Sequence, residues 1–440
     1  MTTTGASLAP CEEKEGLMKV LVVGGGGREH AICEAVSRSK RVTKIYCAPG
    51  NGGIAELAEC VPITPMEFSK LTSFAKEEGI DLTIVGMDDP LVGGIVDAFE
   101  AEGLRVFGPR KNAAILEGSK AFSKDLMKKY NIPTAAYETF DDAEKALEYL
   151  ESAKFPIVLK ADGLALGKGV LICQDLDEAK AGVKQIMQDK KFGDAGNHMV
   201  IEEFMTGREV SMLSFVDGRT IRLMSSAQDH KRAGDGDTGL NTGGMGNFSP
   251  SPFYTDEIDR YCREHIYQKT VDAMAAEGRP FKGVIFFGLM LTEDGPKVLE
   301  YNARFGDPEA QVVLPRLKTD IIDICDACID GTLSDLDLEF EDKAAVCVVL
   351  ASDGYPLSYE KGKLITGLDT FKGKEDYYCF HAGTKKTPEG IVTNGGRVLG
   401  ITAKGDTLKQ ARERAYVATG WVDFENKYMR HDIGKAIEEE

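Results

Sequence analysis

Three polar residues near the end of an apolar strand could together handle a metal ion and a phosphate. Glu300, Asn302 and Arg304 alternate at the end of the strand-like run 297–301. Because successive side chains of a strand point to opposite faces, residues two apart share a face. A carboxylate and an amide oxygen form the hard, oxygen-only donor set that suits Mg²⁺, with Mn²⁺ as a second possibility. An arginine beside them can neutralise a phosphate or hold a carboxylate.

A strand end followed by a turn would explain the same three residues without chemistry. The metal hypothesis therefore requires a nucleotide, and two lysines could hold its phosphates. Lys160 ends the apolar strand FPIVLK, where an unpaired ammonium would be costly, so we expect a phosphate partner. Lys168 lies in a glycine-rich turn that resembles a hairpin flap closing over a triphosphate, and a solvated turn lysine is the equal alternative. The spacing Gly163, Gly167, Lys168 is not that of a Walker P-loop.

A third segment could hold the nucleoside. The apolar strand in HMVIEEFMTGREV opens into Glu202 and Glu203, and Glu209 follows. We expect a hinge whose backbone reads an adenine edge while a carboxylate holds the ribose. Two surface acids beside a turn are the alternative.

The N-terminal part predicts an anion site of its own. A short strand, 19–23, enters the glycine turn GGGGREHA and then a helix, which is a phosphate cradle because free N–H groups and the helix dipole favour an anion. The dinucleotide fingerprint is not met. Glu29 stands at the third glycine position, and the second strand ends in Ala48 and Pro49 without an acidic residue. The pattern favours the phosphate of a ligand other than NAD.

The alternation of strands and helices continues to about Arg110, with a strand DLTIVG, a loop MDDP and a helix from Leu91. This predicts a small parallel-sheet domain with its ligand at the carboxyl ends of the strands. Further on, the glycine-rich stretch 232–250 reads as a long flexible loop, a type that is usually functional. From Lys343 the pattern predicts a smaller α+β closing domain without chemistry, in which His381 is lone and structural.

Composition excludes several classes of protein. The 440 residues exceed one ordinary core, and a net charge of −18 disfavours nucleic-acid binding. No apolar run reaches the roughly 18 residues that span a membrane. The ten scattered cysteines indicate reduced thiols in a cytosol. We therefore expect a cytoplasmic monomer or small homo-oligomer with neither nucleic-acid nor membrane partners.

Six motifs in order resemble the ATP-grasp superfamily and, within it, the glycinamide ribonucleotide synthetase family. They are VGGGGREHA, LEGSKAF, LKADGLALGKGV, VIEEFMTGREVS, QDHKRAGDGDTGLNTGGMG and EYNARFGDPEAQ. The resemblance covers about Met18 to the C-terminus. It implies that ATP phosphorylates the carboxylate of glycine and that the amine of 5-phosphoribosylamine attacks the glycyl phosphate.

The resemblance also implies residue roles. It assigns catalysis to Arg304, Asp229 and Lys231, and Mg²⁺ to Glu300 and Asn302. ATP as co-substrate would contact Lys120, Lys160, Lys168, Glu202, Glu203, Phe204, Met205 and Glu209. Phosphoribosylamine and glycine would contact Gly26, Gly27, Arg28, Glu29, Asp307 and Pro308.

The fold expected from the resemblance is α/β and α+β multidomain. A Rossmann-like parallel α/β domain precedes a two-lobed ATP-grasp core and a small C-terminal α+β domain. The expected boundaries are a disordered tail 1–17, then 18–121, 122–206, 207–335 and 336–440.

Two departures from the family pattern stand out. The strand IFFGLML before the metal pair carries no third acidic ligand, and the loop MDDP, with Asp88 and Asp89, replaces a Pro-Glu version. Another ATP-grasp ligase or carboxylase remains an alternative. A nicotinamide-dependent dehydrogenase and a non-catalytic nucleotide-binding module are disfavoured.

Overall fold

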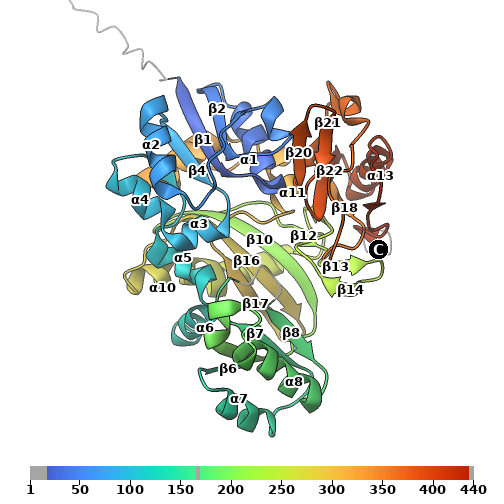
Figure 1. Cartoon of the computed structure of the whole chain (residues 1–440). Coiled ribbons are helices and arrows are strands. Elements are labelled where there is room, and N and C mark those ends of the chain that lie inside the picture. The colour runs from blue at the N-terminus through green and yellow to red at the C-terminus, as the bar shows by residue number, and fades with distance from the viewer. Residues whose placement is uncertain (1–16, 165–168, 436–440) are drawn as a thin grey trace, which may run out of the picture.

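The computed structural model describes residues 17–164 and 169–435 (Figure 1). Its N-terminal sheet has five strands in the order β3-β2-β1-β4-β5, all parallel. The strands are β1 (Met18–Gly24), β2 (Val42–Pro49), β3 (Glu59–Cys60), β4 (Leu82–Val85) and β5 (Val106–Phe107). The helices are α1 (Gly27–Ser37), α2 (Phe68–Glu78), α3 (Asp88–Gly93) and α4 (Ile95–Ala101). The predicted parallel domain is confirmed.

One local prediction in this domain is wrong. The stretch MDDP is not a loop before a helix at Leu91, because Asp88 and Asp89 already form the first turn of α3. Two carboxylates at a helix N-terminus interact favourably with the positive end of the helix dipole.

Two antiparallel sheets form the lobes of the ATP-grasp core. The small lobe has the order β6-β9-β7-β8 and the large lobe has the order β11-β10-β16-β17. The small-lobe elements are β6 (Tyr137–Phe140), α7 (Ala143–Leu150), β7 (Ile157–Ala161), β8 (Val170–Cys173), α8 (Leu176–Val183) and β9 (Met199–Glu203). The large-lobe elements are β10 (Arg208–Asp217), β11 (Ile221–Leu223), α9 (Asp256–Cys262), α10 (Gln268–Ala276), β16 (Lys282–Thr292) and β17 (Gly295–Asn302). Helices α5 (Lys111–Gly118) and α6 (Lys120–Lys129) connect the N-terminal sheet to the small lobe.

The C-terminal sheet recruits strands from the glycine-rich stretch, which corrects its interpretation as a long flexible loop. Strands β12 (Gln228–Asp229) and β15 (Gly246–Ser249) continue the order β12-β15-β18-β22-β19. Between them, β13 (Arg232–Gly234) and β14 (Thr238–Asn241) pair as a hairpin. The other elements are α11 (Ala310–Val313), α12 (Ile321–Asp330), β18 (Ala344–Ser352), β19 (Tyr377–His381), β20 (Thr384–Thr387), β21 (Gly390–Thr393), β22 (Arg397–Gly405), α13 (Leu408–Thr419) and β23 (Lys427–Tyr428).

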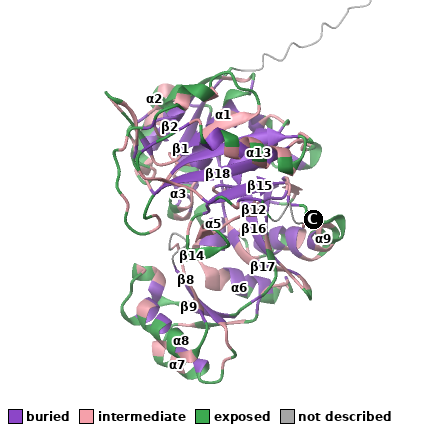
Figure 2. Ribbon diagram, turned by 90° about the vertical axis from the view of Figure 1, so that its right-hand side faces the viewer, coloured by how far each residue is buried: buried purple, intermediate pink, exposed green. Residues whose placement is uncertain are grey.

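One hydrophobic core joins the N-terminal sheet, the large lobe and the C-terminal sheet. Phe215 on β10 lies against Phe107 of β5 and Phe305 after β17, with ring centroids 6.4 and 5.9 Å apart. The same cluster includes Ile32 of α1 and Cys347 of β18. The small lobe has a separate core under α7 and α8, and Figure 2 shows it standing apart from the buried strands of the other sheets. In the part of the chain that the structure describes, every helix is too short or too polar to cross a membrane.

Two buried histidines meet where the N-terminal and C-terminal sheets come together. The backbone N–H of His381 donates to Nδ1 of His30 (2.8 Å), so His381 is not lone. Asn51 Nδ2 donates to the carbonyls of Gly25 (3.0 Å) and His381 (2.7 Å). A Cβ at Gly53 would overlap the His381 ring, so the two sheets approach closely here. Burial lowers the pKa of His30 to about 3, with His381 adding to the effect, and burial lowers the pKa of His381 to about 4.

We predict that this junction makes folding acid-sensitive. Unfolding exposes the imidazoles and returns each pKa to about 6.5. Between that pH and about pH 4 the unfolded chain binds protons that the folded chain does not, so stability falls as the pH falls. The expected cost at pH 5 is about 2 kcal/mol for each imidazole. His381→Gln should therefore lose less thermal stability than the wild type between pH 7 and pH 5, as measured by calorimetry.

The matched control is His198→Gln, because His198 is exposed. That variant should keep the pH response of the wild type. An identical response in His381→Gln would contradict the prediction.

Candidate active site

The predicted metal pair lies at the end of β17, beside a strand that carries no acidic residue. Phe286 and Gly288 of β16 stand opposite Asn302 and Glu300 in the antiparallel register. A Cβ at Gly288 would lie 3.0 Å from Cγ of Glu300, so glycine leaves room for that side chain. Among the described residues, no group of three or more His, Cys, Asp or Glu side chains could hold a metal ion.

Lys231 lies between two carboxylates in this site. Its Nζ is 3.4 Å from Glu300 Oε1 and 2.9 Å from Glu209 Oε2. Burial opposes the charge of Lys231, but Glu209 and Glu300 raise its pKa well above the usual value. The pKa of Glu300 falls to about 2, chiefly because of Lys231. Both groups are therefore ionised at neutral pH, and the lysine stands where a cation would bind the carboxylate.

Four cations from four separate segments act on Glu300. Besides Lys231, the positive charges that lower its pKa are those of Lys160, Lys120 and Arg304. Lys120 opens α6 and donates to the carbonyl of Gly163 (2.7 Å), and burial followed by repulsion from Lys160 lowers its pKa. Like charges gathered at one place repel, so this arrangement suits a multiply charged anion.

Glu202 pairs with two lysines, Lys160 and Lys124. Its two carboxylate oxygens lie 3.0 Å from Lys160 Nζ and 3.1 Å from Lys124 Nζ, and all three side chains are buried. Burial lowers the pKa of Lys124 to about 8, against the attraction of Glu202. Sequence reasoning missed Lys124, although it lies four residues after Lys120 and so on the same face of the helix.

The other hinge residues differ in exposure. Met205 is buried against Ala135 and Met290, with Leu299 beside them, and this apolar cluster lies between the two lobes. Glu203 is exposed and lies 3.9 Å from Lys297, and Phe204 is also exposed. A flat apolar base would pack against the cluster, and the backbone of 203–205 borders it.

At the N-terminal glycine turn, the Glu29 side chain hydrogen-bonds to the backbone. Its Oε2 accepts from the N–H of Gly26 (2.7 Å), and its Oε1 accepts from Nε of Arg28 (2.6 Å). Arg28 also donates to the carbonyl of Phe305 (3.3 Å), so the turn reaches the loop after β17. Burial opposes the charge of Arg28, but the carboxylates of Glu29, Asp307 and Asp88 together outweigh it and raise the pKa. The turn thus adjoins the loop that carries Arg304, and Gly27 begins α1.

Arg397 of β22 also borders the site, although the sequence predicted no chemistry in the C-terminal domain. It donates to the carbonyls of Gly243 (2.6 Å) and Asp307 (2.8 Å) and lies 3.2 Å from Asp307 Oδ2. A Cβ at Gly244 would crowd Asp229 and Pro308, which places those two residues beside the glycine-rich stretch. No local sequence signal marks Arg397, because its partners are distant in the chain.

Asp229 differs from Glu300 in the direction of its pKa shift. Burial and the nearby Glu309 carboxylate raise its pKa well above the usual value, although Lys231 and Arg397 oppose this. Its Oδ1 accepts from the N–H of His230 (2.8 Å).

Arg304 and Asn302 share one buried acid that sequence reasoning also missed. Glu117 Oε1 lies 3.1 Å from Arg304 NH2 and, with the Asn302 amide oriented to satisfy both of its polar atoms, accepts from that amide at 2.9 Å. Asp88 of α3 lies 4.0 Å from the same guanidinium. Lys168 falls outside the described residues. The remaining predicted residues gather from the glycine turn to the hinge, except that Glu203 and Phe204 lie at the surface.

Comparison with known proteins identifies the family. Residues 18–117, 118–310 and 345–436 match the N domain, the ATP-grasp (A) domain and the C domain of phosphoribosylglycinamide synthetase. The chain belongs to the phosphoribosylglycinamide synthetase family. The phosphoribosylamine–glycine ligase of Caldanaerobacter subterraneus subsp. tengcongensis is 51% identical over 416 residues, which cover 94% of this chain and 99% of that protein. The enzyme of the same name from Salmonella typhimurium is 48% identical over 428 residues, covering 96% and 100%.

Solved structures agree with this family and with the predicted fold class. Phosphoribosylamine–glycine ligase from Thermotoga maritima has a TM-score of 0.81 and 35% identity, covering 94% of this chain and 100% of its own. Biotin carboxylase from Campylobacter jejuni has a TM-score of 0.72 at 12% identity, covering 95% and 94%, and shows the fold alone. The predicted boundaries at 121, 206 and 335 stay predictions.

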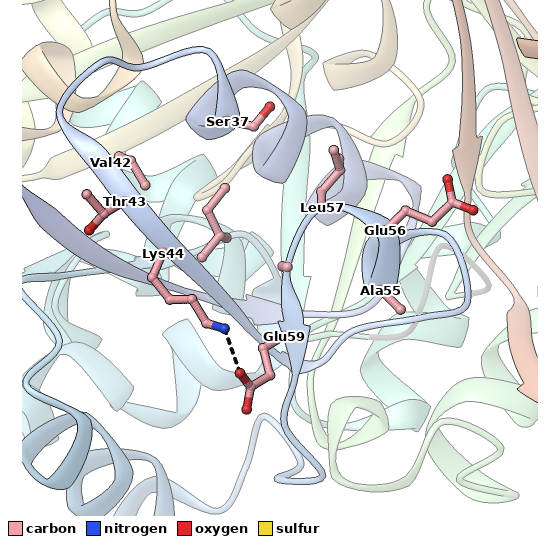
Figure 3. Close-up of a pocket in the computed structure, with 10 residues that line it drawn as sticks. Ser37, Val42, Thr43, Lys44, Ala55, Glu56, Leu57 and Glu59 are labelled. Atoms are coloured by element: carbon pink, nitrogen blue, oxygen red, sulfur yellow. Dashed lines mark ion pairs between the residues drawn. The ribbon is translucent and has the colours of Figure 1, made fainter. Parts of the chain in front are cut away.

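A separate surface groove of about 450 Å³ lies over β2 (Figure 3). It is lined by residues 42–45 and 55–59, and an ion pair between Lys44 and Glu59 (2.7 Å) crosses it. None of the family's motif residues lines this groove, so it is separate from the site.

We predict that Glu300→Gln lowers kcat by about 100-fold or more, because it removes the charge that a metal ion needs. The temperature of thermal unfolding should stay unchanged, since the Glu300 side chain is half-buried and Lys231 still pairs with Glu209. Steady-state ADP release and calorimetry measure the two effects. Asp294→Asn, at the exposed turn of the same hairpin, is the control and should behave as wild type. Wild-type turnover in Glu300→Gln would remove the metal assignment.

We also predict that Lys160→Met raises the KM for ATP by about tenfold, because a charge-assisted phosphate contact contributes roughly 1.5 kcal/mol or more. Lys124→Met is the matched control, since Lys124 forms the other buried ion pair with Glu202 and is not a predicted phosphate ligand. It should destabilise the fold comparably and change KM less. Equal KM values in the two variants would favour a packing role for Lys160.

Proposed function

We propose that this protein joins glycine to 5-phosphoribosylamine with ATP, releasing glycinamide ribonucleotide, ADP and phosphate. The single observation that carries the proposal is the convergence of Lys120, Lys160, Lys231 and Arg304 on Glu300. A triphosphate carries several negative charges, which suits a site where four cations gather. The names of the relatives support the identity of the other two substrates.

In the first step an oxygen of the glycine carboxylate attacks the γ-phosphorus of ATP, and the bond to the bridging oxygen of ADP breaks. Such a transfer requires positioning and charge neutralisation rather than a protein nucleophile. Lys120 and Lys160 bind the phosphates, and the cluster around Met205 packs against the adenine. Glu209 holds the ribose. Arg304 faces the acyl phosphate as it forms, and Asp229 and Lys231 border the same space.

The donor set fits Mg²⁺. Glu300 and Asn302 each offer a hard oxygen as the donor atom, and Mg²⁺ commonly takes one or two protein ligands together with phosphate and water. Glu300 is ionised at neutral pH, as a metal ligand must be. When bound there, the ion would neutralise phosphate charge and orient the triphosphate.

In the second step the amine of phosphoribosylamine attacks the acyl carbon of glycyl phosphate, phosphate leaves, and the nitrogen loses a proton. The turn Gly26–Glu29 and the loop with Asp307 and Pro308 receive this substrate. The helix dipole of α1 and the charge of Arg28 favour its phosphate. We place the protein in the cytoplasm, which agrees with free thiols at every cysteine that the structure describes.

The deciding experiment measures ADP release with each substrate omitted in turn. We expect release to require ATP, glycine and phosphoribosylamine together, with glycinamide ribonucleotide formed in equal amount. Bicarbonate in place of glycine is the control for a carboxylase. ADP release that depends on bicarbonate would refute the proposal. ADP release that does not require phosphoribosylamine would refute it as well.

A further inference from the structure

The carboxylate of Glu117 contacts three consecutive residues of the site. Glu117 lies at the C-terminal end of α5 and is buried. Its Oε2 accepts from the backbone N–H of Ala303 (2.8 Å). Its Oε1 lies 3.1 Å from Arg304 NH2 and accepts from the Asn302 amide at 2.9 Å. One carboxylate thus fixes the backbone between the predicted metal ligand and the predicted acyl-phosphate arginine, together with both of their side chains.

Two of the three guanidinium nitrogens of Arg304 have partners in the fold. NH1 donates to the carbonyl of Phe305 (3.2 Å), and NH2 faces Glu117 at 3.1 Å and Asp88 at 4.0 Å. The Nε of Arg304 is buried, and no hydrogen-bond partner for it exists among the described residues. A guanidinium carries five N–H donors in a fixed plane, so anchoring one edge sets the direction of the others.

The position of Glu117 in the chain links this anchor to the phosphate lysines. Glu117 is three residues before Lys120, and Ser119 between them caps α6 by accepting from the N–H of Phe122 (3.0 Å). Lys120, which opens α6, is one of the cations that act on Glu300. The α5–α6 junction therefore contributes two residues to the site. Glu117 binds the end of β17, and Lys120 is a predicted phosphate ligand.

We infer that Glu117 is a positioning residue, which acts on the reaction through Arg304 and Asn302 and touches no substrate. The inference rests on the proposed function, because it assigns a second task to that same site. All three partners of Glu117 are N–H donors, which a carboxylate alone can satisfy together. A glutamine at this position would turn its own N–H₂ toward one of them.

A buried acid elsewhere in the fold provides a matched control. Asp217, at the end of β10, is also buried and accepts from the backbone N–H groups of Arg219 (3.0 Å), Thr220 (2.7 Å) and Leu333 (3.1 Å). It resembles Glu117 in burial and in number of donors, but none of its partners belongs to the site. Asp217→Asn therefore reports the cost of a merely structural carboxylate.

The test compares Glu117→Gln, Glu117→Asp and Asp217→Asn in the full chain. Glu117→Gln should lower kcat by about 100-fold, the cost of a misplaced catalytic group. Glu117→Asp, which keeps the charge on a shorter side chain, should recover part of this loss. Asp217→Asn should lower the thermal unfolding temperature and keep kcat. Wild-type kcat in Glu117→Gln would overturn the inference.

A double-mutant cycle separates positioning from general destabilisation. If Glu117 acts through Arg304, then Glu117→Gln should add little to the loss already caused by Arg304→Ala, because residues in one contact network are not additive. A structural role predicts that the two losses multiply. Multiplied losses would therefore overturn the inference.

A binding measurement distinguishes failure of the inference from failure of the proposed function. Calorimetric titration with ADP, with and without Mg²⁺, requires neither glycine nor phosphoribosylamine. Wild type and Asp217→Asn should bind ADP more tightly with Mg²⁺, and Glu117→Gln should lose most of that gain because Asn302 is no longer oriented. If Mg²⁺ increases the ADP affinity of Glu117→Gln as much as that of the wild type, the inference is overturned, whatever the ligase assay shows. If the affinities are as expected but no ligase activity is found, only the proposed function is refuted.

Discussion

Charge compensation among buried groups constrains the whole site. Several cations must lie close enough to grip a triphosphate, yet an unpaired buried cation is costly. Among the described residues each of these cations has a protein partner: Lys160 has Glu202, Lys231 has Glu209 and Glu300, and Arg304 has Glu117. Lys120 donates to the carbonyl of Gly163, and burial lowers its pKa although Glu300 attracts its charge. Under the proposed function, a substrate phosphate would compete with these carboxylates for cations that are already in place.

The distribution of hydrophobic cores complements this electrostatic design. The N-terminal sheet, the large lobe and the C-terminal sheet share one core, so Arg28, Arg304 and Arg397 are held on a common support. The small lobe has its own core and carries Lys160 and Glu202. The two bodies meet at the apolar cluster of Met205, Met290 and Ala135. The predicted acceptor side is therefore rigidly assembled, while part of the nucleotide side belongs to a separately packed unit.

Much of the fold and the motif residues could be predicted from the sequence because their signals are local. The glycine turn before α1, the apolar strand before Lys160 and the alternation at Glu300 each occupy a few consecutive positions. Glu117, Lys124 and Arg397 were missed because their roles arise from contacts between distant segments. Glu117 bonds to a backbone 186 residues away, and Arg397 reaches Gly243 across 154 residues. The glycine-rich stretch was taken for a loop for the same reason, since a short strand such as β15 is defined by its partner rather than by its own pattern.

The pairing of β15 with β18 also sets an order of events during synthesis. Gly246 to Ser249 pair with Val348 to Ala345, so about one hundred further residues must be made before β15 has its neighbour. Contacts so distant in sequence form slowly, because a long loop must close first. Asp229 lies on β12, which pairs only with β15 in this sheet, and Lys231 is two residues further on. A chain whose synthesis has not reached β18 therefore lacks the strand that holds β15 and, through it, β12, so the surroundings of Asp229 and Lys231 are not yet ordered.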